Sequence, residues 1–259
     1  MQMKKIVAAT SAIALSLSMT SVAFAATDSG NIQLEVEVLD TLSMDCYDVD
    51  GGLGDTMVTL GDSTTGAGNV VAGVPSVGKS RCNVTTNDDQ GYYLSIMRST
   101  EDVTWAGANG SGQYATATNV LIHEDPNLDG TWYEIPDTLT AFDEATPSTT
   151  NTWTDGTTKG FGFSVVAFPD SSVANNALAD NWTTTGDLCV DGTGPATDVA
   201  EYAGVPAANE AIAAVPEYSA TATTTDVCYK VDVLPTQQSG DYAGQVTFTA
   251  TSDASAYLL

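Results

Sequence analysis

The feature that most constrains this chain is the strict alternation of apolar and polar residues in short segments. In "QVTFTAT" (245–251), Val246 and Phe248 fall on one side of an extended chain, while Thr247 and Thr249 fall on the other. Side chains of a β-strand alternate between the two faces of a sheet, so the pattern predicts a half-buried strand. Helical signals are poor, because the abundant Thr, Gly, Asp and Val favour strands and turns.

The same alternation recurs in several other segments. It is clearest in "NIQLEVEVLD" (31–40), whose apolar face consists of Ile32, Leu34, Val36 and Val38. Further strands are expected at 57–62, in two segments within 73–97 that the turn "NDDQG" joins, at 160–168 and at 228–235. The one helix-permissive stretch, 205–218, is bounded by two prolines and allows a helical turn or two at most.

Short strands separated by turns predict an all-β fold, an antiparallel β-sandwich of the Ig or fimbrial type. Residues 105–158 differ from the rest, because Thr, Asn, Gly and Asp dominate there and three tryptophans are scattered among them. They are predicted to be long loops and short strands inserted in the sandwich, so that residues 26–259 form one domain. A second small domain is the alternative.

The N-terminal residues have the pattern of a secretory signal peptide. Lys4 and Lys5 precede an apolar stretch of small residues that ends in Ala23-Phe24-Ala25, an A-x-A cleavage signal. Cleavage is expected after Ala25, which leaves 26–259 as the mature chain and makes the protein secreted, extracellular or attached to the cell surface. No later stretch is long and apolar enough to span a bilayer.

The mature chain is strongly acidic. Two of the seven basic residues leave with the signal, so five remain beside 33 acidic residues. Such a charge repels nucleic acid and anionic membrane surfaces, which excludes nucleic acid as an expected partner. It suits cations, basic partners or high salt.

All four cysteines follow the predicted cleavage site, at positions 46, 82, 189 and 228. An even number in a secreted chain indicates two disulfides, and three pairings are open. We favour Cys46–Cys82 and Cys189–Cys228, because each pair flanks one run of strands. The chain has no C-x-x-C, which argues against a redox motif or a zinc knuckle.

The candidate metal site is "EDPNLDGTWYEIPD" (124–137). Asp125, Asn127 and Asp129, followed by Gly130, match the start of a calcium loop, whose alternating oxygen ligands converge on one hard cation. Pro136 stands where a bidentate Glu is expected, so Glu134 is the candidate remaining ligand. Calcium is the one cofactor the sequence favours, and an ordinary acidic turn is the alternative.

Catalytic patterns are missing from the sequence. His123 is the only histidine, no G-x-S-x-G elbow is present, and nothing marks a pair among the many carboxylates. The chain is therefore expected not to be an enzyme, with a glycoside-type hydrolase as the remote alternative. Three tryptophans, Trp105, Trp132 and Trp153, are candidates for a glycan-stacking surface, and filling the core is the other explanation for them.

Three segments together resemble a known kind of protein. They are "VTTNDDQGYYLSI" (84–96), "EYAGVPAANEAI" (201–212) and "YKVDVLPTQQSGDYAGQVTFTAT" (229–251). The set resembles uncharacterised secreted β-rich surface proteins of bacteria, notably of candidate-phylum lineages. The last segment is also similar to the C-terminal strands of WxL-type, fimbrial and spore-coat modules. The Trp-x-Leu signature is missing, so wall binding does not carry over. The resemblance implies a cell-surface role without catalytic residues.

These observations predict a secreted or cell-surface structural or adhesive protein that is not catalytic and that assembles with copies of itself. Its expected partners are further copies, surface glycans or surface proteins. A carbohydrate- or host-binding module that uses exposed Trp and Tyr residues is the alternative. The strand at 31–40 either pairs within its own sheet or adds to the exposed edge of a neighbour.

Overall fold

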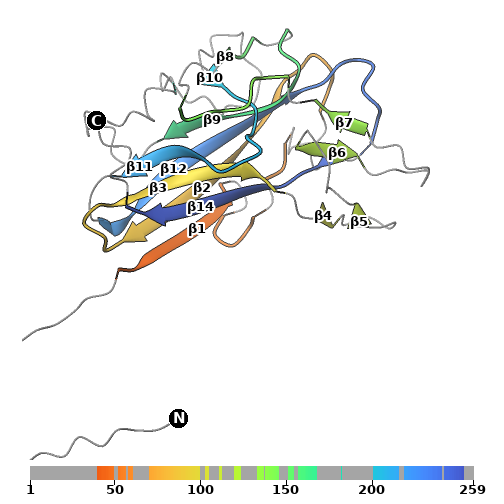
Figure 1. Cartoon of the computed structure of the whole chain (residues 1–259). Coiled ribbons are helices and arrows are strands. Elements are labelled where there is room, and N and C mark those ends of the chain that lie inside the picture. The colour runs from red at the N-terminus through yellow and green to blue at the C-terminus, as the bar shows by residue number, and fades with distance from the viewer. Residues whose placement is uncertain are drawn as a thin grey trace, which may run out of the picture. The chain divides into compact units, whose positions relative to one another are not determined.

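The structure is a computed structural model (Figure 1). It describes residues 40–49, 52–56, 58–60, 70–99, 103–104, 111–112, 120–123, 133–136, 138–145, 151–154, 157–167, 182, 201–215, 219–240 and 242–253. These residues belong to one compact unit, Leu39–Leu259. The predicted strand at 31–40 lies outside the described residues except for Asp40.

Every regular element in the described part of the chain is a β-strand, which confirms the all-β prediction. The strands are β1 (Leu42–Asp48), β2 (Ser76–Thr86), β3 (Tyr92–Arg98), β4 (Val103–Thr104), β5 (Ser111–Gly112), β6 (Leu121–His123), β7 (Tyr133–Ile135), β8 (Asn151–Thr152), β9 (Gly160–Ala167), β10 (Glu201–Tyr202), β11 (Glu210–Val215), β12 (Ser219–Asp232), β13 (Tyr242–Ala243) and β14 (Val246–Ser252). All pairs between these strands are antiparallel.

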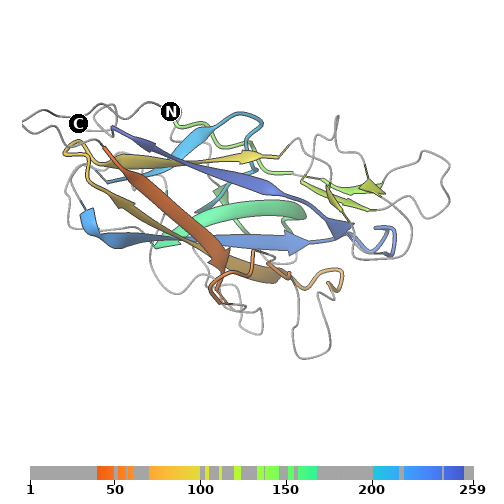
Figure 2. The same ribbon diagram turned by 90° about the horizontal axis from the view of Figure 1, so that it is seen from below.

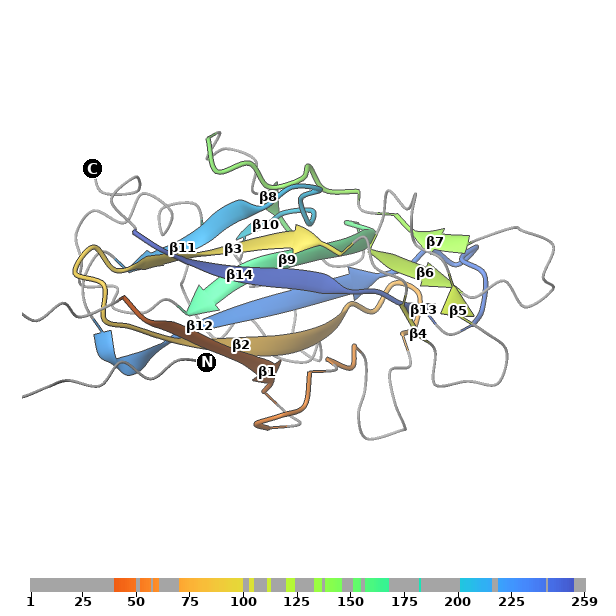
Figure 3. The ribbon, with the colours of Figure 1, turned by 60° about the horizontal axis from the view of Figure 1, so that its bottom comes forward.

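Two larger sheets carry most of the fold. The first, here named the β2 sheet, has the order β1-β2-β12-β9, and the second, named the β3 sheet, has the order β11-β3-β14. Both sheets can be followed in Figures 1 and 3. Three smaller groups, β13-β6-β7, β10-β8 and β4-β5, accompany them. The short strands β5 to β8 fall within the predicted insertion, 105–158.

The turn after β2 carries the chain from one large sheet to the other. It is the predicted "NDDQG" turn, in which the Gln90 N–H donates to Asp88 Oδ1 at 2.8 Å and the Gly91 N–H donates to Asp88 O at 3.1 Å. Gly91 has a φ of 74°, a conformation that glycine adopts without a steric penalty. A tight local turn therefore connects strands of different sheets.

The two sheets share one hydrophobic core. Alternate residues of each strand point into it, as the period of two requires. Its members from the β2 sheet include Cys82, Val84, Phe161, Phe163, Val165, Val227, Tyr229 and Val231. Its members from the β3 sheet include Tyr92, Leu94, Ile96, Ile212, Ala213 and Val215.

The other face of the β2 sheet is also partly covered. Trp153 and Tyr202, which follow or belong to β8 and β10, pack there with Val77 and Cys228 in a second buried cluster. The Lys230 Nζ lies 5.7 Å from the centroid of the Trp153 ring and 5.5 Å from that of Tyr202. A cation over the face of an aromatic ring is attracted by the ring quadrupole, which favours this buried placement of lysine.

Two strands differ from their predicted form. β11 occupies part of the stretch in which a helical turn or two was the most expected, and its Ala and Ile residues are buried against β3. The pairing with β3 overrides the weak helical preference of "EAIAAV". β12 begins at Ser219, well before the predicted start at 228, because its threonine-rich first half pairs with β2.

Candidate functional site

The edge strand β14 is incompletely covered. Its core-facing side chains, those of Val246, Phe248 and Ala250, pack against the core but are only half-buried. By contrast, Leu94 and Ile96 of the neighbouring β3 are fully buried. The apolar row of the last strand therefore remains partly open to solvent at the side of the sheet.

The hydrogen bonds at the two ends of β14 show which of its backbone groups face β3. The Ser99 N–H donates to Gln245 O, and the Asp253 N–H donates to Gly91 O, each at 3.0 Å. Backbone groups of successive residues in a strand point to opposite sides. The odd-numbered residues of β14 therefore bond to β3, while Val246, Phe248 and Ala250 direct their N–H and C=O groups toward the free side. Within the described ranges no strand pairs with that side.

β1 has the same arrangement at the edge of the β2 sheet. The Asn87 N–H donates to Thr41 O at 3.2 Å, and the Val49 N–H donates to Lys79 O at 3.0 Å, so odd-numbered residues bond to β2. The even-numbered residues Leu42, Met44 and Cys46 therefore direct their backbone N–H and C=O groups away from β2, toward the free side of β1. Leu42 and Met44 are 36% and 37% exposed, which is unusual for large apolar side chains in a row.

The two open strands lie at the same side of the molecule. β1 and β14 are in contact but are not hydrogen-bonded to each other. In Figure 2, β1 (orange) and β14 (dark blue) lie close together at one end and diverge toward the other. The partly exposed apolar residues of the two strands are together named the open edge, which consists of Leu42, Met44, Cys46, Val246, Phe248 and Ala250.

The opposite edges of the two sheets are covered. β9 exchanges two backbone hydrogen bonds of 2.9 Å between Phe163 and Ala203. On β11, the Ala211 N–H donates to the Glu144 carboxylate at 2.5 Å. Phe142 and Trp182 pack over this side of the core and are almost completely buried. The outer sides of β9 and β11 therefore differ from those of β1 and β14.

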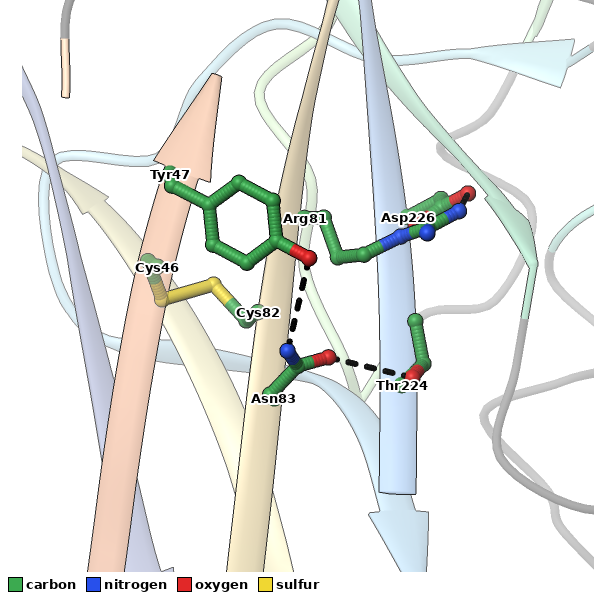
Figure 4. A network of polar contacts seen from close by, with 7 residues as sticks. All are labelled: Cys46, Tyr47, Arg81, Cys82, Asn83, Thr224 and Asp226. Atoms are coloured by element: carbon green, nitrogen blue, oxygen red, sulfur yellow. Dashed lines mark hydrogen bonds and ion pairs between the residues drawn. A yellow bond between two sulfur atoms is a disulfide. The ribbon is translucent and has the colours of Figure 1, made fainter. Parts of the chain in front are cut away.

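A disulfide fixes β1 to its hydrogen-bonded neighbour β2. Cys46 and Cys82 are directly opposed across the β1–β2 pair, with Cα atoms 4.1 Å apart. The bond confirms the predicted pairing of these two cysteines (Figure 4). Cys228 is disulfide-bonded as well. Its predicted partner, Cys189, lies outside the described residues.

Polar side chains occupy the other face of the β2 sheet beside this disulfide. The Arg81 guanidinium donates to Asp226 through Nε at 2.6 Å and through a terminal nitrogen at 2.8 Å. This hydrogen bonding raises the pKa of Arg81 further above its ordinary value. Asn83 connects Tyr47 of β1 with Thr224 of β12, at 3.4 Å and 3.1 Å (Figure 4). The network thus links three neighbouring strands.

A buried ion pair joins the ends of β9 and β12. The Lys159 Nζ lies 2.5 Å from Asp232 Oδ2, and the Asp232 side chain is fully buried. Its other oxygen accepts from the Gly73 N–H at 2.9 Å. Both oxygens of the buried carboxylate are therefore hydrogen-bonded, as burial of a charge requires.

Tyr92 is a buried titratable group between the sheets. Its hydroxyl is hydrogen-bonded to Thr223 Oγ1 at 2.5 Å, and the Thr223 hydroxyl lies 3.1 Å from Val84 O. Burial raises the pKa of Tyr92 to about 12, against the opposing effect of the hydrogen bond to Thr223. Burial also raises the pKa of Tyr229.

These pKa shifts predict a loss of stability at alkaline pH. An unfolded tyrosine releases its proton near pH 10, whereas Tyr92 in the folded chain holds it to about 12. Between these values the unfolded chain binds fewer protons, so the free energy of unfolding falls as pH rises, by about 3 kcal/mol for this group. The contribution is fully present below pH 10. Denaturant unfolding at several pH values measures it.

Tyr92→Phe is the test of that assignment. The variant should lose less stability between pH 10 and 12 than the parent, and Tyr229, whose pKa burial also raises, should still contribute to the loss. Tyr93→Phe is the matched control, because Tyr93 lies on the other face of β3 and is half-buried. An unchanged alkaline decline in Tyr92→Phe would contradict the assignment.

The predicted calcium ligands are largely outside the described residues. This applies to Asp125, Asn127 and Asp129. Glu134 lies half-buried in β7, and its backbone carbonyl accepts from Gln237 Nε2 at 3.1 Å. In the part of the chain that the structure describes, no group of three His, Cys, Asp or Glu side chains is placed to hold a metal ion. Calcium binding at 125–134 stays a prediction.

The structure corrects one of the predicted glycan contacts. Trp153 is 2% exposed, with its ring 5.5 Å from that of Tyr202, so it fills the core and cannot stack on a sugar from solvent. Trp105 and Trp132 lie outside the described residues. His123 ends β6, paired with Tyr242 and Tyr133.

Comparisons of the chain with family models, with curated proteins and with solved structures found no match. Within the described residues, no helix has the length and apolar character needed to cross a membrane.

Proposed function

We propose that this chain is a secreted or cell-surface structural or adhesive subunit, an Ig- or fimbrial-like β-sandwich that joins copies of itself through the open edge. The proposal rests on the contrast between the two sides of the fold. Neighbouring segments hydrogen-bond to Phe163 of β9 and to Ala211 of β11, whereas within the described residues no strand pairs with the outer sides of β1 and β14, whose apolar side chains are partly exposed. Monomeric proteins usually protect such edges, because they pair readily with other chains.

Compartment and charge are consistent with this function. The signal-like N-terminus and the Cys46–Cys82 disulfide suit an oxidising environment outside the cell. The large excess of carboxylates makes copies repel each other at low ionic strength. The Debye length is only about 10 Å at 0.1 M salt, so added salt or a divalent cation should favour association.

The experiment is size-exclusion chromatography with light scattering on residues 26–259. Oligomers or fibres are expected at moderate salt, with further growth in calcium and a return toward smaller species in chelator or at low salt. Magnesium at the same concentration is the control for general screening by a divalent cation. A monomer under all of these conditions would remove self-assembly as the function and leave a binding module as the alternative.

A further inference from the structure

We propose that residues 31–38 of one copy add as a strand to β14 of a second copy. This inference deepens the proposed function, on which it rests, by naming the segment and the edge that join. β14 supplies the acceptor edge, and the segment "NIQLEVEV" (31–38) of the predicted strand that precedes β1 supplies the donor. The mode is β-strand addition, in which main-chain hydrogen bonds and alternate side chains act together.

The backbone of β14 has hydrogen-bonding groups that an added strand could pair with. Val246, Phe248 and Ala250 direct their N–H and C=O groups away from β3, as the hydrogen bonds at Gln245 and Asp253 establish. The same residues carry the half-buried apolar side chains. A strand that pairs with their backbone therefore places its own inward side chains beside an uncovered apolar row.

The donor segment has the matching side chains. Ile32, Leu34, Val36 and Val38 form one apolar face, and Glu35 and Glu37 lie on the other. With the apolar face inward, it would cover Phe248 and the exposed side chains of Leu42 and Met44 across the open edge. The glutamates would then lie on the solvent side, in line with the outward threonines of β14. Eight residues span about 26 Å, which suits the seven residues of β14.

The geometry at Thr41 favours a second copy over the segment's own chain. The Thr41 N–H donates to Asn87 Oδ1 and its carbonyl accepts from the Asn87 N–H, so the chain continues the β1–β2 ladder in an extended form there. Only Leu39 and Asp40 remain to reverse the direction between 31–38 and Thr41. A two-residue hairpin that returned 31–38 to the free side of β1 would need positive φ and would favour Asn-Gly or Gly, which Leu-Asp does not supply.

The pairing is directional. The donor segment and the acceptor edge are different surfaces, so each copy can give one strand and receive one. Such a heterologous contact produces an open filament unless the rotation between copies closes a ring. The N-terminal side of β1 and the C-terminal end of β14 both meet the turn after β2, since Thr41 bonds to Asn87 and Asp253 bonds to Gly91.

Two variants of the 26–259 chain separate donor from acceptor. Val36→Asp puts a charge on the apolar face of the donor, at a position that precedes the compact unit Leu39–Leu259. Ala250→Pro removes an N–H that faces the free side of β14, a position where an edge strand tolerates proline. Each variant alone should remain monomeric at a concentration tenfold above that at which the parent assembles.

A mixture of the two variants gives the decisive result. The proline variant retains a working donor and the aspartate variant retains a working acceptor edge, so the mixture should form one-to-one dimers that do not grow further. Glu37→Gln and Thr251→Ala are the matched controls on the opposite faces, and both should assemble as the parent does. Thermal unfolding checks that each variant is folded.

The outcomes separate the two proposals. If the parent assembles and Val36→Asp assembles equally well, this inference is wrong while self-assembly through another surface stands. A mixture that stays monomeric also overturns the inference. If the parent never assembles, the proposed function fails together with the inference. Hydrogen exchange that protects 32–38 in a monomeric parent would show that the segment pairs within its own chain.

Discussion

Replacing Phe163 with alanine is expected to lower the free energy of unfolding by about 4 kcal/mol, the usual cost of removing a large buried aromatic side chain. Phe163 is 0% exposed at the covered side of the core. Its ring lies 5.2 Å from Trp182 and 6.2 Å from Phe142, measured between ring centroids. These rings come from separate segments, so the cavity cannot close without moving all of them. Chemical denaturation of residues 26–259 measures the loss.

Phe248→Ala is the matched comparison on the open edge. The same atoms are removed, but Phe248 is only half-buried, so we expect a loss of about 1–2 kcal/mol in the monomer. The difference between the two variants tests the distinction between the covered and the open side. Equal losses in monomeric protein would mean that β14 is covered in solution.

The second large effect is expected for the cross-strand disulfide. Substituting both Cys46 and Cys82 with serine should cost about 4 kcal/mol, because the bond closes a loop of 36 residues and restricts the unfolded chain. The paired substitution is preferable to a reducing agent, since Cys228 is also disulfide-bonded. Denaturant midpoints of parent and variant give the difference in stability.

The location of the effect can be measured as well. Among the described strands β1 pairs with β2 alone, and its first residues are exposed, so hydrogen exchange in the variant should rise in β1 more than in β12. The single variants are unsuitable as controls, because each leaves a free thiol. Ser43→Ala, at an exposed position of β1, tests whether any change in that strand has the same consequence. A uniform rise across the sheet would contradict a local role for the disulfide.

Strands with one apolar face were predictable from the sequence. β3, β9 and β14 each place alternate large residues in or against the core, so apolar residues recur at every second position of their sequences. The "NDDQG" turn was predictable for a similar reason, since Asp88 and Gly91 have local roles that neighbouring residues suffice to define. The Cys46–Cys82 pairing was open among three until the β1–β2 register placed the two residues opposite each other.

Features that depend on long-range packing were not predictable. Lys230 and Asp232 alternate with Tyr229 and Val231, so they have the pattern of a solvent face, yet both are buried. They are covered because Trp153 and its neighbours pack on that face of β12, and Lys159 pairs with Asp232. The local sequence of β12 does not indicate that its second face is buried as well.

The open edge itself was beyond sequence reasoning for a topological reason. Which strand lies at an edge depends on the order β1-β2-β12-β9 and β11-β3-β14, in which sequence neighbours are mostly not spatial neighbours. The pattern of β14 alone indicates half-burial. It does not distinguish a strand flanked on both sides from one that has a free side. Only the register and the hydrogen bonds at Gln245 and Asp253 reveal that difference.

The Cys46–Cys82 bond also determines how the fold would respond to mechanical force. A pull on the chain before Thr41 would act first on the β1–β2 pairs and would peel them from that end. Peeling would stop after Leu42–Asp45, because the next residue, Cys46, is held by a covalent bond. β2 lies between β1 and β12, so the tension would then pass to a strand that is paired on both sides. The edge strand thus serves as a short tether, and the load is carried by the interior of the sheet.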